Sequence, residues 1–475
     1  MNISNLLAPY NPWRQDGNVD NAFKHLPQFK RPVFEDIFFA LKNVPQIISI
    51  TGPRRVGKST LIRQTIKKLI AEGVHPQRLI YYSMDDPALL LTNTDHDKFF
   101  TALMEHSVSM DAPDTTYVFL DEIQRFPGWE LFLKKYYDLD YPIRFCISGS
   151  ATTPIFKKSR ESLLGRIKDF HVLPFSFREF LLYHNLDLSV VLNNIYKTGK
   201  TIQGMLSEHF KYADLEEVHV PQIEEHLRDN ISYYFEIFLK EGGFPEVWSL
   251  PDWETKQSYL FDNQVKKVIL EDLVLTVELR KPEMLKRFYI SLLENPGREI
   301  NFQKLASDLG VSRATIETYF PLLEMTDLIR HIDRFSKSYI STRRGNIKCY
   351  LTDLALRNAV LRIGDTLLED EATVGLYAEN LVFNALKKWQ GVVNIGYYRD
   401  KTREVDFIVS AGAGRYLPVE VKYKNNINAG QLKVIRTLCK QFDQNGIVVT
   451  KQWDDFGKRD CLFYIPLPHF LLLFD

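Results

Sequence analysis

The chain has 475 residues, of which 45% are apolar and 25% charged, and this composition excludes an intrinsically disordered or fibrous protein. Because this length exceeds what one ordinary hydrophobic core accommodates, we expect two to four domains. Sixty basic residues balance sixty acidic ones, which excludes attraction to nucleic acid through the net charge and leaves only local basic patches for it.

The first chemical signature is a glycine-rich loop between a predicted strand, which contains Ile47, Ile48 and Ile50, and a helical pattern that begins at Leu61. A strand, a tight turn and a helix start point backbone N–H groups at one small volume, which suits a polyphosphate. We therefore expect ATP to bind a P-loop formed by Gly52, Pro53, Arg54, Arg55, Val56, Gly57, Lys58, Ser59 and Thr60. Lys58 is expected to reach the β- and γ-phosphates, and the Ser59 hydroxyl to bind Mg²⁺.

A second apolar run, residues 117–120, ends in the acidic pair Asp121-Glu122. On a buried parallel strand this pattern places both acids at the carboxyl end, beside the phosphate loop. We expect Asp121 to hold Mg²⁺ through its water shell and Glu122 to orient or deprotonate the attacking water, which is the catalytic step of hydrolysis. The alternative is an ordinary strand end with two solvated acids.

Five strings of the sequence belong together: the loop at residues 52–60, Leu-Asp-Glu-Ile-Gln at 120–124 followed by Trp129, Ser-Gly-Ser at 148–150, Leu-Pro-Phe-Ser-Phe-Arg-Glu-Phe at 173–180, and Gly-Gly-Phe-Pro-Glu at 242–246. With these strings the chain resembles a large prokaryotic family that joins an AAA+-type ATPase to an uncharacterised C-terminal region. The resemblance implies an ATP-binding P-loop fold and assigns no settled biological task. Residues 183–230 depart from it, and we interpret them as an insertion whose later part, with seven acids against two bases in residues 207–229, forms a solvated helix or a partner surface.

Two further residues are candidates for the ATPase site. Ser150, after a predicted strand at residues 143–147, is expected to sense the γ-phosphate, although serine and glycine are also typical of an ordinary turn. Arg166 is the candidate catalytic arginine, acting within its own chain or across the subunit boundary of a homo-oligomer. Arg160, Arg54 and Arg55 are the alternatives, as is an Arg166 that forms only a salt bridge.

The middle of the chain predicts a helix, a tight turn at Gly310 and a second helix capped by Ser312. This pattern resembles a winged helix-turn-helix. Six basic residues against the single acid Asp333 form the expected wing: Arg330, Arg334, Lys337, Arg343, Arg344 and Lys348. We expect the wing to contact DNA phosphates without reading bases, with a rigid connector or an oligomerisation surface as the alternative.

The last hundred residues hold a second chemical constellation. Glu379 lies in a predicted helix over residues 377–389, Asp406 in a strand over 403–409, and Glu420 and Lys422 on one side of a strand over 417–422. The arrangement resembles the PD-(D/E)XK nuclease core, with Val405 where proline is usual. Glu379, Asp406 and Glu420 would then hold a divalent cation, and Lys422 would stabilise negative charge in catalysis. Two half-buried strands with solvated charges are the alternative.

We therefore predict an α/β chain in five parts: an N-terminal extension over 1–30, an AAA+-type ATPase domain with a parallel sheet over 31–182, a helical lid and linker over 183–280, a winged helix over 281–360, and an α/β restriction-endonuclease-like domain over 370–475. ATP and Mg²⁺ are the expected cofactors, and DNA and a further copy of the chain the candidate partners. The four separated cysteines favour reduced thiols. The lack of a membrane-length apolar run or a leader pattern predicts a cytoplasmic protein without a membrane partner. The rival interpretations are an ATP-switched scaffold with an inactive nuclease-like domain and a DNA-binding regulator.

Overall fold

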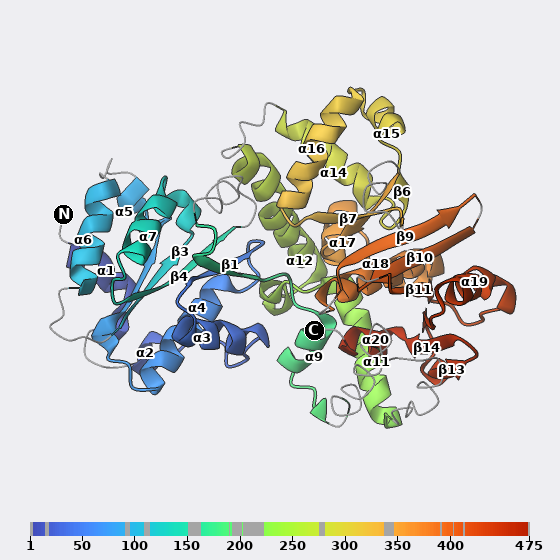
Figure 1. The fold of residues 1–475 in the computed structure, drawn as a ribbon, viewed down its shortest axis with the longest axis horizontal. Helices are drawn as coiled ribbons and strands as arrows, with labels where there is room; N and C mark the ends of the chain where they lie inside the picture. Colours follow the sequence, from blue (N-terminus) through green and yellow to red (C-terminus); the bar gives the residue numbers. More distant parts are fainter. Residues whose placement is uncertain are drawn as a thin grey trace. The chain divides into compact units, whose positions relative to one another are not determined.

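The computed structural model describes residues 3–14, 19–90, 96–108, 115–150, 163–189, 191, 202, 223–274, 281–336, 346–389, 392–401, 403–411 and 414–473. The chain divides into two compact units (Figure 1). The first comprises Met1–Leu173, Leu270–Arg280 and Met325–Asp327, and the second comprises Pro174–Ile269, Lys281–Glu324 and Leu328–Asp475.

The first unit is built on a five-stranded sheet in the order β2-β3-β4-β1-β5, with all neighbouring strands parallel. Its strands are β1 (Ile47–Gly52), β2 (Leu79–Ser83), β3 (Thr116–Asp121), β4 (Ile143–Ser150) and β5 (Ile167–His171). The apolar runs of β1, β3 and β4 are confirmed as buried strands, as expected for a parallel sheet covered on both faces. β4 continues through Ser150, three residues beyond the predicted end of the strand at Ile147, so the alternative of an ordinary turn there is excluded.

Helices cover this sheet: α3 (Val33–Asn43), α4 (Lys58–Ala71), α6 (His96–Val108) and α7 (Trp129–Asp138). Phe100 of α6 and Trp129 of α7 belong to one buried apolar cluster with Val118 of β3 and Ile147 of β4. Shorter turns join these elements: η3 (Pro76–Arg78), α5 (Pro87–Leu90) and η4 (Ile123–Arg125).

The N-terminal segment lies along the edge strand β2. It forms α1 (Ile3–Leu7), η1 (Ala8–Tyr10), η2 (Pro12–Arg14) and α2 (Val19–Ala22). The Asn11 side chain pairs with the backbone of Tyr81, donating to its carbonyl at 2.8 Å and accepting from its N–H at 2.7 Å. The Trp13 indole N–H donates to Leu79 O at 3.2 Å. The predicted extension is therefore an integral part of the first unit.

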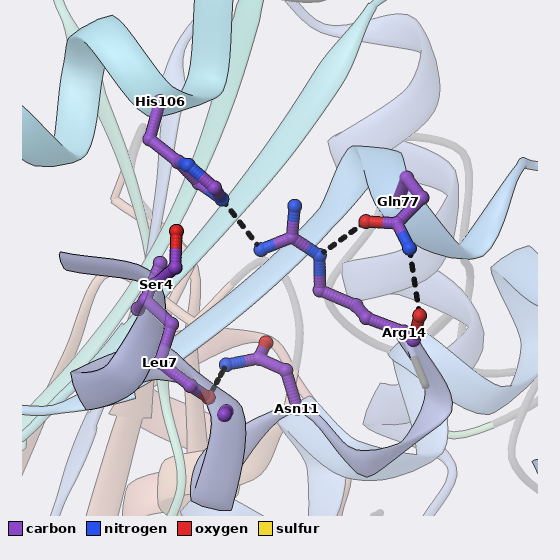
Figure 2. Close-up of a pocket in the computed structure, with 7 residues that line it drawn as sticks. Ser4, Leu7, Asn11, Arg14, Gln77 and His106 are labelled. Carbon is purple, nitrogen blue, oxygen red and sulfur yellow. Dashed lines mark hydrogen bonds between the residues drawn. The ribbon is translucent and has the colours of Figure 1, made fainter. Parts of the chain in front are cut away.

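A cavity of about 230 Å³ lies under this segment (Figure 2). The Arg14 guanidinium lines it, donating from Nε to Gln77 Oε1 at 3.1 Å, with Nη1 2.9 Å from His106 Nε2. Burial lowers the pKa of both Arg14 and His106. Gln77 precedes β2, so the cavity lies at the amino end of the sheet, whereas the phosphate loop follows the carboxyl end of β1.

The second unit begins with the helices α9 (Phe177–Tyr183), α11 (Glu225–Glu241), η6 (Pro245–Ser249) and α12 (Trp253–Leu260). The π-helix η7 (Phe261–Asp272) follows, and its last three residues belong to the first unit. Then follow α14 (Pro282–Leu293), β6 (Glu299–Ile300), α15 (Phe302–Leu309), α16 (Arg313–Met325), β7 (Ile329–Asp333) and β8 (Ile347–Leu351). The strands form an antiparallel sheet in the order β6-β8-β7. The predicted helix, turn and helix are confirmed, because Gly310 ends α15 at φ 67° and Ser312 Oγ accepts from Thr315 N.

The last part of the chain forms a six-stranded mixed sheet in the order β13-β14-β12-β11-β10-β9. Its strands are β9 (Asn394–Asp400), β10 (Arg403–Ser410), β11 (Tyr416–Lys422), β12 (Gly446–Thr450), β13 (Gly457–Arg459) and β14 (Leu462–Pro466). The helices of this region are α17 (Leu354–Leu361), α18 (Glu371–Lys388), α19 (Lys433–Phe442) and α20 (Leu467–Leu473), with short turns η8 (Asp365–Glu369), η9 (Ala429–Leu432) and η10 (Trp453–Asp455). No helix within the described ranges is both long enough and apolar enough to span a membrane.

Candidate functional site

The P-loop connects β1 to α4 through two glycines with left-handed backbone. Gly52 has φ 143°, and a Cβ there would lie 1.9 Å from Val172 O, so a side chain cannot be accommodated. Gly57 caps α4 at φ 95°, and Arg55 between them has φ 65°. Ser59 and Thr60 follow in the first turn of α4, where the N–H groups of a helix start are available to an anion.

The Lys58 side chain folds over this loop and is only 5% exposed. Its Nζ donates to Gly52 O at 3.0 Å and to Pro53 O at 2.6 Å. Burial lowers the pKa of Lys58, opposed by the negative charges of Glu122 and Asp121. The amine is thus held between the loop and the acidic pair at the end of β3.

Asp121 is held by two side chains from the flanking strands. Tyr81 OH on β2 donates to its Oδ2 at 2.9 Å, and Ser148 Oγ on β4 donates to its Oδ1. Glu122 adopts a left-handed backbone with φ 51° and accepts from Gln124 Nε2. The sequence interpretation missed Tyr81 and Ser148, although both follow from strand order: each lies near the carboxyl end of a strand that neighbours β3.

Ser150 lies in register with Gly52 and is buried, so the structure brings it to the first glycine of the loop. Arg54 leaves the loop toward Asp272, donating from Nε to Oδ2 at 2.7 Å and from Nη2 to Oδ1. This two-point pair ties the segment Leu270–Arg280 to the P-loop within the first unit. Sequence reasoning missed Asp272, which is distant in the chain and part of no motif.

Arg166 is not brought to the P-loop of its own chain. Its carbonyl accepts from Ile47 N at 2.8 Å, which places it at the amino end of β1, opposite the loop. Its guanidinium bonds Asp138 at 2.6 and 3.2 Å. Within one chain the side chain therefore has the salt-bridge role that was the alternative. Arg160 lies outside the described residues.

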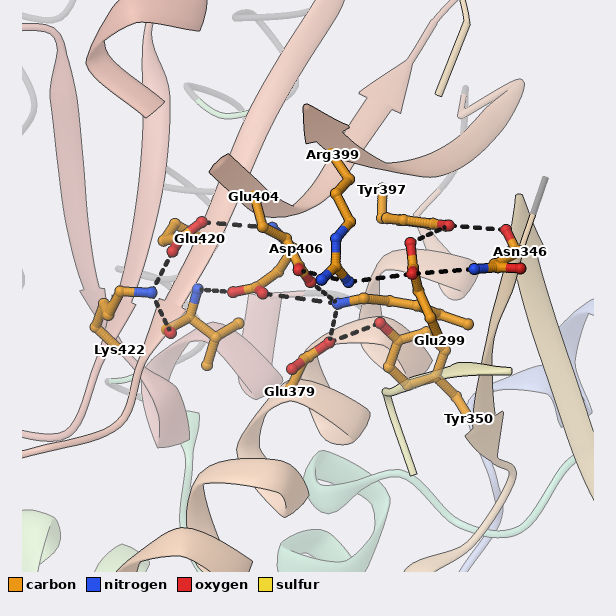
Figure 3. A network of polar contacts seen from close by, with 12 residues as sticks. Glu299, Asn346, Tyr350, Glu379, Tyr397, Arg399, Glu404, Asp406, Glu420 and Lys422 are labelled. Atoms are coloured by element: carbon orange, nitrogen blue, oxygen red, sulfur yellow. Dashed lines mark hydrogen bonds and ion pairs between the residues drawn. The ribbon is translucent and has the colours of Figure 1, made fainter. Parts of the chain in front are cut away.

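The structure brings together the four residues predicted for the second constellation, which are Glu379, Asp406, Glu420 and Lys422 (Figure 3). Asp406 on β10 accepts from Val421 N at 2.8 Å through Oδ2, and Asp406 N donates to Glu420 Oε2 at 3.4 Å. Lys422 Nζ donates to Glu420 Oε1. Glu379 on α18 lies in the same cluster, because Lys348 Nζ contacts both Glu379 Oε1, at 3.0 Å, and Asp406 Oδ1, at 3.9 Å.

The electrostatics of this cluster favour an added positive charge. Burial, followed by the negative charge of Asp406, raises the pKa of Glu379 to about 7 and that of Glu420 to about 8. A cation bound nearby would lower both pKa values and so favour ionisation of both acids near neutral pH.

Sequence reasoning assigned Lys348 to the basic wing, and this is wrong. Lys348 is 3% exposed, and its Nζ lies 3.0 Å from Glu379 Oε1 and 2.7 Å from Glu404 Oε1. Tyr350 OH also donates to Glu379 Oε1, at 2.7 Å. The signal for Glu404 was available, since strand alternation puts it on the same side of β10 as Asp406.

The cluster has the donor type that Mg²⁺ prefers, three carboxylates carried by a helix and two adjacent strands. As the side chains lie, however, no three histidine, cysteine or acidic residues in the described ranges are placed to hold a metal ion together. The ammonium groups of Lys348 and Lys422 lie against the same oxygens. The three carboxylates suit the cation chemically once these ammonium groups move away from the oxygens.

The structure describes only some of the remaining wing residues. Lys337, Arg343 and Arg344 lie outside the described residues. Arg334 donates to Arg399 O. In α16, the only base of the presumed recognition helix, Arg313, pairs with Glu317 at 2.9 Å.

Comparison with known families matches three consecutive parts of the chain. Residues 44–181 match the family described as "AAA domain". Residues 233–367 and 374–470 match two domains of unknown function, DUF8612 and DUF4143. Residues 44–181 thus form an AAA-type domain, and the P-loop lies inside it.

Two curated relatives align with most of this chain at low identity. An uncharacterized protein of Methanocaldococcus jannaschii is 26% identical over 378 residues, covering 78% of this chain and 73% of the relative. An uncharacterized protein of Haemophilus influenzae is 25% identical over 416 residues, covering 85% and 86%.

Among solved structures, AMPPCP-bound DnaA from Aquifex aeolicus aligns at 14% identity with a TM-score of 0.22, covering 61% of this chain and 86% of that one. The Saccharomyces cerevisiae Hsp104–ADP complex aligns at 12% identity with a TM-score of 0.28, covering 74% and 42%. These TM-scores are too low to support a conclusion about this chain.

Proposed function

We propose that the first unit binds ATP with Mg²⁺ and hydrolyses it. The observation that carries the proposal is the convergence of Lys58, the glycine-bounded loop and the buried Asp121 at the carboxyl ends of β1 and β3. Phosphoryl transfer needs positioned positive charge and a positioned water more than covalent chemistry, and this edge of the sheet supplies groups for both.

Each residue has a separate task in this proposal. The loop N–H groups cradle the phosphates, and Lys58 exchanges the loop carbonyls for phosphate oxygens. Ser59 and Asp121 hold Mg²⁺, which neutralises charge on the phosphates. Glu122 orients the attacking water, and Ser150 senses the γ-phosphate. Arg166 acts across a subunit boundary, since it lies at the opposite end of β1 from its own P-loop.

Two variants test the ATPase. Lys58→Ala is expected to abolish nucleotide binding, and Glu122→Gln to retain ATP while lowering turnover by about 100-fold or more, the range typical for loss of a catalytic base. Lys67→Ala, on the exposed face of the same helix, is the matched control. Fluorescent-nucleotide binding and phosphate release measure the two steps, and unchanged turnover in both variants would remove the assignment.

We further propose that the last sheet is a metal-dependent phosphodiesterase acting on DNA. The order α18, β9, β10, β11, α19, β12 supports this proposal, with Asp406 and Glu420 on adjacent strands and Glu379 on the preceding helix. A divalent cation held by these three would polarise the phosphate and lower the pKa of a bound water. Lys422, beside Glu420, would stabilise the developing negative charge.

Incubation of linear and circular DNA with Mg²⁺ or Mn²⁺ tests this second activity. Cleavage by the wild type that Asp406→Asn abolishes would support it. If no condition gives cleavage and no metal binds, the scaffold interpretation is favoured, in which ATP switches a protein whose nuclease-like domain is inactive.

The middle module supports a DNA-contact role, because α14, α15, α16 and the β6-β8-β7 sheet follow the order of a winged helix. Non-specific contact through Arg343 and Arg344 predicts that their double alanine variant binds duplex DNA more weakly at low salt and with a shallower salt dependence. Fluorescence anisotropy at two salt concentrations measures this, and equal binding discards the wing as the contact.

A further inference from the structure

Lys348 is a side chain of the acidic cluster that comes neither from the six-stranded sheet nor from α18. Lys348 lies on β8, the middle strand of the three-stranded sheet. Its Nζ reaches Glu379 Oε1 at 3.0 Å, Glu404 Oε1 at 2.7 Å and Asp406 Oδ1 at 3.9 Å. One ammonium group is therefore shared by three carboxylates, the environment that a hard divalent cation also requires.

The cluster holds more acidic than basic groups. Two ammonium groups face four carboxylates, Lys348 and Lys422 against Glu379, Glu404, Asp406 and Glu420. Arg399 contacts Glu404 at 3.3 Å but is shared with Glu299 at 3.1 Å. With every group ionised, the cluster keeps an excess of two negative charges, and a divalent cation would neutralise it.

The position of Lys348 conflicts with that cation. Both need the oxygens of Glu379 and Asp406, and two positive charges within a few ångström in a buried site repel each other strongly. Lysine can resolve the conflict because its ammonium sits on a flexible stem of four carbons, unlike the rigid guanidinium of arginine.

We propose that Lys348 is a tethered cation that competes with a divalent metal ion for Glu379 and Asp406, so that metal binds only when this side chain swings out of the cluster. The proposal rests on the proposed function of the last sheet, because it takes Glu379, Asp406 and Glu420 as the metal-binding residues. It adds regulation to that site: a ligand that shifts β8 changes the metal affinity.

Metal binding to the full-length, nucleotide-free chain tests the competition. Lys348→Met is expected to bind Mn²⁺ at least tenfold more tightly than the wild type, as measured by titration calorimetry. Lys433→Met, an exposed lysine on α19, should leave the affinity unchanged. In the Lys348→Met background, Asp406→Asn should remove the gain, which assigns it to this cluster.

Lysine labelling of the wild type gives a second measurement that needs no variant to fold. Lys348 is 3% exposed, so an amine-acylating reagent should modify it slowly, and saturating Mn²⁺ should accelerate the modification several-fold. Mass spectrometry reads the modification at this residue.

The outcomes separate the two proposals. Equal Mn²⁺ affinity of wild type and Lys348→Met, with binding lost in Asp406→Asn, overturns the tethered cation and leaves the metal site standing. A Lys348 that stays protected at saturating Mn²⁺ does the same. Absence of Mn²⁺ binding in all variants overturns the metal site itself, and the nuclease proposal with it.

Discussion

His469 is a buried titratable residue whose neutral form the fold requires. It lies on α20, 1% exposed, with its ring 4.8 Å from that of Phe456. Burial lowers its pKa to about 3. In the unfolded chain a histidine titrates near pH 6.5, so below that pH the unfolded state binds a proton that the folded state does not.

The free energy of unfolding should therefore fall as the pH drops from about 6.5 toward 3, by roughly 1.4 kcal/mol per pH unit from this group. At pH 5 the loss is about 2 kcal/mol. His469→Phe should flatten this dependence, while His25→Phe, at an exposed position, should not. Urea unfolding between pH 5 and 7.5 measures it, and parallel curves for His469→Phe and wild type would contradict the prediction.

Tyr81 positions the carboxylate of Asp121 through the 2.9 Å hydrogen bond from its hydroxyl. We predict that Tyr81→Phe lowers the apparent Mg²⁺ affinity in ATP hydrolysis by about tenfold, the lower end of what such supporting groups cost. Tyr82→Phe is the matched control, since the neighbouring hydroxyl bonds Asp86 instead. Initial rates across a Mg²⁺ titration distinguish the two, and equal Mg²⁺ dependence would exclude the positioning role.

The residues that sequence reasoning found and missed differ in a physical way. Lys58 and Asp121 lie in short contiguous strings whose spacing follows from a turn or a strand end. Asp272 lies more than 200 residues along the chain from its partner Arg54, and Lys348 lies about 30 residues from Glu379. Only the packed fold brings these pairs together. A basic residue between two strand patterns indicates a wing equally well whether it points outward or, as Lys348 does, inward.

Among the elements, the Gly242-Gly243 turn shows why a short motif marks a packing contact. Gly243 O accepts from Phe175 N at 2.8 Å, and Gly243 N donates to Asp353 Oδ2 at 2.7 Å. A Cβ on Gly243 would lie 2.2 Å from Phe175 O, a backbone atom that cannot move alone. The turn thus joins the end of α11 to the segments before α9 and α17 inside the second unit.

Gly243→Ala is expected to lower the free energy of unfolding by about 3 kcal/mol, the upper range for overpacking a filled site. Gly364→Ala, in the same unit, meets nothing within 4 Å and should change it little. Chemical denaturation compares the two, and similar midpoints would show that the turn relaxes at small cost.

Secondary structure was largely predictable where the pattern was long and regular. The strands at β1, β3, β10 and β11 and the helix-turn-helix are confirmed close to their expected bounds. The end of β4 could not be predicted in this way, because Ser-Gly-Ser is a turn sequence in isolation and becomes a strand only through its pairing with β1.

For the molecule as a whole, the chain returns twice to its first unit. Leu270–Arg280 and Met325–Asp327 belong there with Met1–Leu173. They bring Asp272 to Arg54 and Asp327 to His171, at 3.1 Å between Oδ1 and Nε2. Boundaries drawn along the sequence could not show this, because composition and periodicity carry no information on such returns.

A fragment ending at Leu173 should therefore be less stable than the same unit in the full chain. The fragment loses the contacts of Asp272 with Arg54 and of Asp327 with His171, at a cost of about 1–3 kcal/mol each. Urea unfolding, followed by a signal from Trp129, compares the fragment with the full chain. Asp272→Ala in the full chain removes only one of the two contacts and should give a smaller loss of stability. Equal midpoints would mean that the returning segments do not stabilise the unit.

The hydrogen bonds from Asn11 to the edge strand β2 protect this strand from pairing with a foreign strand. An edge strand presents a row of free peptide groups on which a foreign strand can grow into a fibre. On β2 the Asn11 amide and the Trp13 indole already take such groups, and on β9 the Phe335 N–H, bonded to Tyr397 O at 2.7 Å, does the same. Each of these two edge strands is thus partly paired by its own chain, and removal of the residues up to Arg14 would expose the Leu79 and Tyr81 peptide groups of β2 to pairing with a foreign strand.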